Sequence, residues 1–117
     1  MTESFRNLVV WQKAKALVRD IYETAKSFPK DEIYGLTAQV RRAAISIPSN
    51  IAEGKGRSTN PDFRHFLLQA RGSLYELENQ LEIAKDLAYI SETQLSALVG
   101  KCNEVGRLLN GLINSLK

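Results

Sequence analysis

The sequence is poor in the residues from which most reactive and metal-binding sites are built. It has one cysteine, Cys102, and one histidine, His65, among 117 residues. A single cysteine excludes an intramolecular disulfide framework, and the two residues together exclude a dense Cys/His metal site. We therefore expect the protein to bind no metal and no other cofactor.

Long apolar runs and targeting signals are also missing. No stretch approaches the roughly 20 consecutive apolar residues that a membrane-spanning helix needs. The segment Met1 to Arg6 contains no apolar region of the kind that directs secretion. We expect a cytoplasmic protein with no membrane partner.

The overall composition is that of one globular domain. Hydrophobic residues make up 44% of the chain and charged residues 25%, a balance that argues against disorder. The length suits a single domain, and it is large enough to bury a core without disulfides or metals. We expect residues 1–117 to form one domain.

Apolar residues recur at helical spacing in the first half of the chain. Asn7 is a favourable N-cap, and the segment from there to about Lys26 places its apolar residues on one face. A second helix carries the apolar residues from Ile33 to Ile51. Gly54 and Gly56 should end it, because glycine tolerates the left-handed conformation common at helix C-termini.

The second half of the chain has stronger helix signals. Asn60 followed by Pro61 combines a cap with a proline in the first turn. Ser91 with Gln94 forms a capping box that opens a fourth helix. Apolar residues of both helices alternate steps of four and three, which favours bundle packing. The seams consist of Phe63, Leu67, Ala70, Leu74, Leu77, Leu81, Ala84 and Ala88, and of Leu95, Leu98, Val99, Cys102, Val105, Leu109, Leu112, Ile113 and Leu116.

Short connections between these helices imply antiparallel neighbours. The predicted fold is therefore all-α, an up-down-up-down antiparallel four-helix bundle. Pro48 falls inside the second helix, where proline lacks a backbone donor and collides with the preceding turn. We expect helix two to be kinked at Pro48.

Charge is segregated along the chain, although the net charge is only +3. Basic residues dominate the segment from residue 41 to residue 71, and acidic residues dominate residues 72 to 90. Arginine suits phosphate because its planar fork donates two parallel hydrogen bonds. The basic residues could contact RNA or DNA phosphates, or they could pair with the acidic third helix of a neighbouring subunit. The candidate nucleic-acid-binding residues are Arg41, Arg42, Lys55, Arg57, Arg64 and Arg71.

Signals for catalysis are weak. His65 follows Asp62 by three residues, but no nucleophile is placed beside this pair, and a surface histidine is the favoured interpretation. Arg57 and His65 are too far apart for the Arg-His pattern of ribonucleases built on small helical bundles. The segment Gly54-Lys55-Gly56 lacks the spacing of a phosphate-binding loop. Cys102 lies on an apolar seam, where cysteine is inert. We expect no enzyme activity.

More apolar residues are present than a four-helix core needs. Aromatic and aliphatic residues outside the seams favour an interface and hence self-association. Gly72 inside the third helix costs helix propensity, which indicates either a close approach by another helix or simple tolerance. The surplus residues are Val9, Trp11, Tyr22, Tyr34, Ile45, Leu68, Tyr75, Ile83, Leu87 and Tyr89.

Three segments carry a family resemblance. They are Phe5–Ala14, Leu36–Arg57 and Phe66–Glu78, and the most specific run is Ser46-Ile47-Pro48-Ser49-Asn50-Ile51-Ala52-Glu53-Gly54. The chain resembles the bacterial four-helix-bundle family named for proteins encoded in intervening sequences of 23S ribosomal RNA genes. The likeness covers Phe5 to about Ile90, and the fourth helix matches only in its pattern.

The resemblance implies an up-down bundle that assembles into a ring of five subunits, a homopentamer with a central channel. It also implies kinship with the accessory protein of diversity-generating retroelements, which engages a reverse transcriptase and its RNA. Possible partners are thus a second copy of the chain, structured RNA, and a reverse transcriptase or other ribonucleoprotein component. The alternative is a structural or protein-interaction module that binds no nucleic acid.

Within this family picture, the residues around Pro48 are expected to be architectural. The side chains of Ser46, Ser49 and Asn50 would satisfy backbone groups that the proline frees. Glu53 would pair with an arginine and fix the geometry of the helix end.

Overall fold

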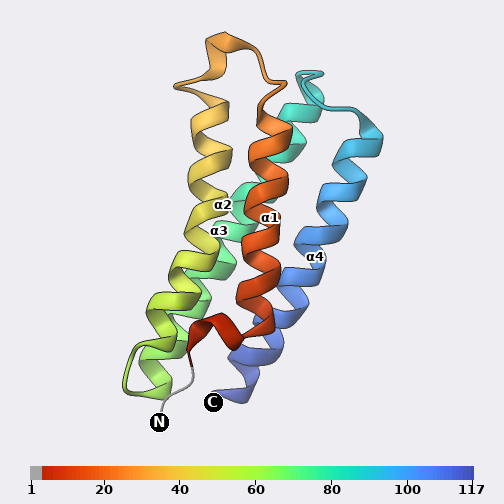
Figure 1. The fold of residues 1–117 in the computed structure, drawn as a ribbon. Helices are drawn as coiled ribbons and strands as arrows, with labels where there is room; N and C mark the ends of the chain where they lie inside the picture. The colour runs from red at the N-terminus through yellow and green to blue at the C-terminus, as the bar shows by residue number, and fades with distance from the viewer. Residues whose placement is uncertain (1–3) are drawn as a thin grey trace.

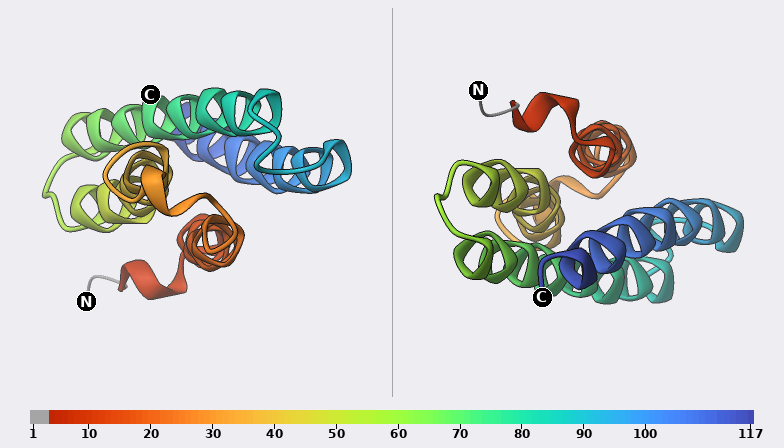
Figure 2. Two further views of the ribbon diagram at one scale, coloured as in Figure 1. Left: turned by 90° about the horizontal axis from the view of Figure 1, so that it is seen from above. Right: turned by 90° about the horizontal axis from the view of Figure 1, so that it is seen from below.

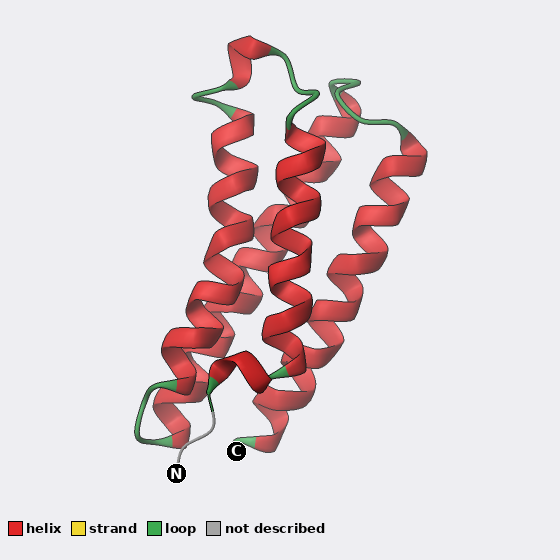
Figure 3. Cartoon of the chain, in the orientation of Figure 1, coloured by secondary structure: helices red, strands yellow, loops and turns green. Residues whose placement is uncertain are grey.

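The computed structural model describes residues 4–117. The segment Met1 to Arg6, in which the sequence shows no secretion signal, lies partly outside the described residues. Within the described residues the chain is all-helical and contains no strand (Figures 1 and 3). The four long helices are α1 (Val9–Ala25), α2 (Leu36–Lys55), α3 (Asn60–Asp86) and α4 (Glu92–Ser115), with short 3-10 helices η1 (Phe5–Asn7) and η2 (Lys30–Glu32).

The helices form the predicted up-down-up-down bundle. Each packs against the next in chain order, and α1 also packs against α4 (Figure 2). The most extensive contact joins α2 to α3. The fold predicted from apolar periodicity is confirmed.

The predicted seams form most of the core. Every seam residue of α3 from Phe63 to Ala84 is buried, as are six of those in α4, which include Cys102 and Leu109. Two positions differ from the prediction. Ile33 is 48% exposed, because it lies in the turn before α2. Ala88 is exposed, because α3 has already ended at Asp86.

Two helix caps are shifted by one residue from their predicted positions. The N-cap of α1 is Leu8, while Asn7 belongs to η1. The N-cap of α3 is Thr59, whose Oγ1 accepts a hydrogen bond from the Asp62 amide at 3.3 Å. Asn60 is consequently the first residue of α3. The capping box of α4 is confirmed with both of its hydrogen bonds.

The start of α2 depends on a contact that the sequence did not predict. The Glu32 carboxylate accepts a hydrogen bond from the Leu36 amide at 2.9 Å and one from the Tyr89 hydroxyl at 2.7 Å. The Tyr89 ring also packs against Phe28, with centroids 5.5 Å apart. Glu32 therefore caps α2 from its preceding turn and ties that turn to the α3–α4 connection.

The end of α3 uses an unusual residue. Ala88 has a φ of 62°, a left-handed conformation that glycine adopts more readily. The Ala88 amide donates to the carbonyl of Lys85, and the Tyr89 amide donates to that of Ala84, each at 2.9 Å. These are the two hydrogen bonds of a Schellman motif. The strained backbone turns the chain so that Tyr89 reaches Glu32.

The glycines at the end of α2 have a different role from the one predicted. The helix ends at Lys55 as expected, but no glycine among the described residues has a positive φ. A Cβ on Gly54 would lie 2.8 Å from the Cβ of Phe66 and 2.9 Å from Cδ1 of Phe63. Gly54 therefore allows the close approach of α3. The need for glycine at this position comes from that contact and not from an unusual backbone conformation.

Pro48 bends α2 without ending it. The helix is continuous through Pro48, and its axis bends in its second half (Figure 1). The Asn50 side chain donates to the Ser46 carbonyl at 2.8 Å, and the Ser73 hydroxyl donates to the Ser46 hydroxyl at 2.9 Å. Ser49 is exposed and makes no side-chain hydrogen bond within residues 4–117. None of these bonds reaches the Ala44 carbonyl, which Pro48 leaves without its helical donor, so the predicted role is not seen for Ser46, Ser49 or Asn50 within residues 4–117.

The close contact at Gly54 predicts a large difference between two glycine substitutions. Gly54→Ala should lower the free energy of unfolding by about 1–3 kcal/mol, because its methyl group overpacks the α2–α3 contact. Gly72→Ala is the matched control, since no atom of a neighbouring element in residues 4–117 lies within 4 Å of its Cβ position. It should raise stability by about 0.5–1 kcal/mol through helix propensity. Urea denaturation followed by circular dichroism measures both, and equal effects would contradict the assignment.

The Glu32 contacts predict an acid-sensitive contribution to stability. The hydrogen bond from the Leu36 amide, and then that from Tyr89, lowers the pKa of Glu32 below its usual 4.5. A lowered folded-state pKa stabilises the fold above pH 4.5, and that stabilisation is lost as pH falls through the folded-state value. Glu32→Gln should lower the melting temperature at neutral pH. The melting-temperature difference between the variant and wild type should become smaller in acid. A constant difference at every pH would contradict this prediction.

Candidate functional site

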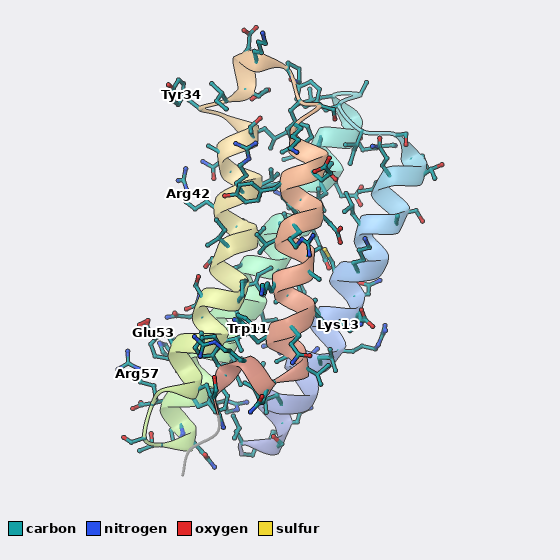
Figure 4. All side chains as sticks on the ribbon, in the orientation of Figure 1. Trp11, Lys13, Tyr34, Arg42, Glu53 and Arg57 are labelled. Carbon is teal, nitrogen blue, oxygen red and sulfur yellow. The ribbon has the colours of Figure 1, made fainter. Side chains whose placement is uncertain are left out.

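Part of the predicted basic set gathers at the hairpin between α2 and α3. Lys55 ends α2, Arg57 lies in the connecting loop, and Arg64 follows one turn after α3 begins. Figure 4 shows Arg57 at this end of the bundle, close to Glu53. We call Lys55, Arg57 and Arg64 the hairpin cluster.

Arg57 is the best-positioned member of the hairpin cluster. Its guanidinium lies over the Phe66 ring, 4.7 Å from the ring centroid. One terminal nitrogen of the guanidinium is 3.3 Å from the Glu53 carboxylate. This is an ion pair between Glu53 and an arginine, as the sequence analysis expected. Both side chains of this pair are about half exposed, with fractions of 46% and 54%. The guanidinium is therefore held in place while part of it still faces solvent.

Lys55 and Arg64 are more enclosed. The Lys55 ammonium lies 5.9 Å from the Phe63 ring centroid, and its side chain is half-buried. The Nε of Arg64 is buried and has no hydrogen-bond partner within residues 4–117. Arg57 is consequently the member most open to an incoming phosphate.

The remaining candidates lie elsewhere on the bundle. Arg42 is exposed on α2, thirteen residues before Lys55, which corresponds to about 20 Å along the helix (Figure 4). Arg41 stacks on Tyr22 of α1 at 4.9 Å. Arg71 donates to the Asn110 side chain of α4 at 2.9 Å. The structure thus divides the predicted basic set among three surfaces.

An apolar groove lies between α1 and α2, and neither Arg41 nor Arg42 is among its lining residues. The groove has a volume of about 380 Å³, and we call it the α1–α2 groove; its lining consists of Phe5, Trp11, Lys15, Val18, Ile45, Pro48, Ser49 and Ala52. Ile45 is one helical turn from both arginines. On the α1 side, Lys15 and Arg19 are exposed and also one turn apart. These two cations were missed because they lie far outside the basic segment of the sequence.

His65 lies on the surface without catalytic neighbours. Its side chain is exposed, with Nε2 3.1 Å from the Gln69 amide nitrogen and the ring against the edge of Phe66. No group of three or more His, Cys, Asp and Glu side chains in residues 4–117 is arranged to hold a metal. None of the helices described here has both the length and the apolarity to cross a membrane.

Cys102 is buried in the core, as its seam position predicts. Desolvation, followed by the nearby Glu78 carboxylate, raises the pKa of its thiol to about 12. Desolvation and the charge of Glu82 likewise raise the pKa of Glu78. The thiol is therefore protonated and shielded at neutral pH, which does not suit a nucleophile.

Comparisons with known proteins identify both family and fold. The sequence profile described as "23S rRNA-intervening sequence protein" matches residues 6–111. A solved structure from Bacteroides thetaiotaomicron VPI-5482, described as a protein of unknown function from the S23 ribosomal protein family, is similar to this chain. The two share 25% sequence identity with a TM-score of 0.83, over 90% of this chain and 98% of the other. No curated protein matches the chain.

The environment of Cys102 predicts low thiol reactivity. Iodoacetamide at pH 8 should leave the native protein unmodified and should alkylate it once urea has unfolded it, because only the thiolate reacts. Mass spectrometry measures both samples. Rapid alkylation of the native protein would show that Cys102 is accessible and ionised, contrary to this structure.

Proposed function

Because the chain belongs to the 23S rRNA-intervening sequence protein family, we propose that it is a non-enzymatic bundle that binds structured RNA. In this proposal it assembles as a ring homo-oligomer, and the hairpin cluster contacts RNA phosphates, either alone or within a ribonucleoprotein. The observation that carries the proposal is the position of Arg57, held on Phe66 at an exposed end of the bundle.

The chemistry of Arg57 suits a backbone contact. Stacking on Phe66 fixes the plane of the guanidinium, so less conformational entropy is lost when a phosphate binds. The exposed pair with Glu53 contributes little, since such pairs are worth about 0–1 kcal/mol. A phosphate can therefore replace Glu53 as the partner of Arg57. Contacts of this kind bind RNA without strong sequence preference.

The proposal restricts RNA contact to the hairpin cluster. Arg71 is half-buried and donates to Asn110, and Arg41 is half-buried with its Nε enclosed, so both are less open to a phosphate than Arg57. Arg42 lies too far along α2 to share a phosphate with Arg57. The wider set predicted from the sequence would be needed only by an RNA that extends along the side of α2.

A second candidate function is a protein-interaction module without nucleic-acid binding. The observation in its favour is the α1–α2 groove, which is apolar and has Lys15 in its lining. In that case Lys15 and the apolar side chains of the groove would hold a protein partner. If this second function is correct, substitutions in the groove should abolish binding of the protein partner. The chain should also bind no RNA at any salt concentration, which distinguishes this function from the first proposal.

Charge reversal at Arg57 tests RNA binding. Fluorescence anisotropy with several short structured RNAs should show affinity that falls steeply as salt rises. Arg57→Glu should weaken binding to all of them alike, by about tenfold or more at low salt, and reduce the salt slope by about 1. Arg107→Glu, an exposed site on α4 with the same charge change, is the control. Salt-insensitive binding, or equal losses in the two variants, would overturn the proposal.

A further inference from the structure

A second pocket lies between α3 and α4, and it shares no lining residue with the hairpin cluster or the α1–α2 groove. Its volume is about 310 Å³, near the lower end of the range of small-molecule sites, which is about 300–1,000 Å³. We call it the α3–α4 pocket. Its lining includes Leu74, Tyr75 and Glu78 of α3 and Gly106, Arg107 and Asn110 of α4.

The α3–α4 pocket contains two opposite charges that do not pair with each other. Glu78 is half-buried and Arg107 is exposed, and neither makes an ion pair within residues 4–117. Desolvation, followed by the charge of Glu82, raises the pKa of Glu78. This is the behaviour of a carboxylate that has lost water and gained no cation in its place.

The distance along α4 explains why the two charges stay apart. After desolvation, the charge of Glu78 is the second cause that raises the pKa of the Cys102 thiol, so these two side chains lie close together. Arg107 follows Cys102 by five residues, which corresponds to about 7–8 Å along the helix. An α-amino acid that makes a charge-assisted hydrogen bond of about 2.8 Å at each end is long enough to span this distance.

The Arg107 end of the pocket has the groups that hold a carboxylate. Asn110 lies one turn after Arg107, and its Oδ1 accepts a hydrogen bond from Arg71 at 2.9 Å. That bond orients the Asn110 amide so that its NH₂ group can donate to another acceptor. A carboxylate in the pocket would therefore receive hydrogen bonds from the Arg107 guanidinium and from the Asn110 amide.

The pocket also has apolar walls. Leu74 and the ring of Tyr75 contribute them from α3. A Cβ on Gly106 would lie 3.5 Å from Cδ2 of Leu74, an ordinary van der Waals contact, so the packing of α4 on α3 does not require glycine here. The absent side chain of Gly106 instead enlarges the pocket beside Leu74.

We propose that the α3–α4 pocket binds a small zwitterion of the α-amino-acid type. Its ammonium group pairs with Glu78, and its carboxylate is held by Arg107 and Asn110. Its side chain packs against Leu74 and Tyr75. This inference goes beyond the proposed function, because it involves neither RNA nor a protein partner.

Ligands with a single charge fit the pocket less well. A polyamine or another cation would neutralise Glu78 but would be repelled by Arg107. A phosphate or another anion would bind Arg107 but would be repelled by Glu78. A molecule that carries both charges satisfies both ends of the pocket.

Calorimetry with amino acids tests the inference. The melting temperature of the wild-type protein should rise in the presence of at least one of the standard amino acids, because a ligand that binds only the folded state stabilises it. Isothermal titration then measures the affinity for that amino acid. Its amide lacks the carboxylate and its N-acetyl derivative lacks the ammonium, so each should bind about tenfold more weakly or worse.

Substitutions separate binding in the pocket from a general effect of the solute. Glu78→Gln and Arg107→Gln each remove one charged end, and each should weaken binding about tenfold or more. Glu76→Gln on α3 and Arg42→Gln on α2 are the matched controls. They remove the same charges at exposed positions outside the pocket and should bind like wild type. Circular dichroism verifies that each variant folds.

Three results would overturn the inference. They are a melting temperature that no amino acid raises, equal affinity for the amide or the N-acetyl derivative, and equal losses in the pocket and control variants. RNA is absent from these experiments and the hairpin cluster is unchanged, so none of the outcomes depends on whether that cluster binds RNA.

Discussion

The architecture depends on the close approach of α2 and α3 at their shared hairpin. Gly54 lets the backbone of α2 lie against Phe63 and Phe66, and the hydrogen bond between Ser73 and Ser46 joins the same helices farther along. The approach also fixes the candidate site, because Phe66 is the ring on which Arg57 stacks. Packing that stabilises the bundle therefore orients the arginine proposed to contact phosphate.

Most of the fold could be predicted from the sequence because it depends on local signals. Apolar periodicity identified the core of α3 and α4, and the Ser91 capping box placed the start of α4 correctly. The contacts that were missed join distant segments. Glu32 and Tyr89 are 57 residues apart in the chain, so no local pattern indicates their hydrogen bond. The left-handed Ala88 was missed because alanine seldom occupies that conformation.

The candidate site could be predicted only in part. Charge segregation identified a basic segment of the sequence, but the direction of each side chain around its helix decides which neighbour it meets. Arg41 thus faces α1, Arg71 faces α4 and Arg57 remains at the hairpin. Lys15 joins Ile45 and Pro48 in one groove only through the packing of α1 on α2. A list of charges along the chain cannot show which of them meet in one pocket.

The central claim is that the charges left unpaired within the chain serve partners outside it. Light-scattering mass of the wild-type protein, at low and moderate salt and with and without short structured RNAs, tests it most directly. The account predicts a multimer that gains RNA mass at low salt and releases it as salt rises, since phosphate contacts are screened by counterions. A monomer that takes up no RNA at either salt concentration would contradict it.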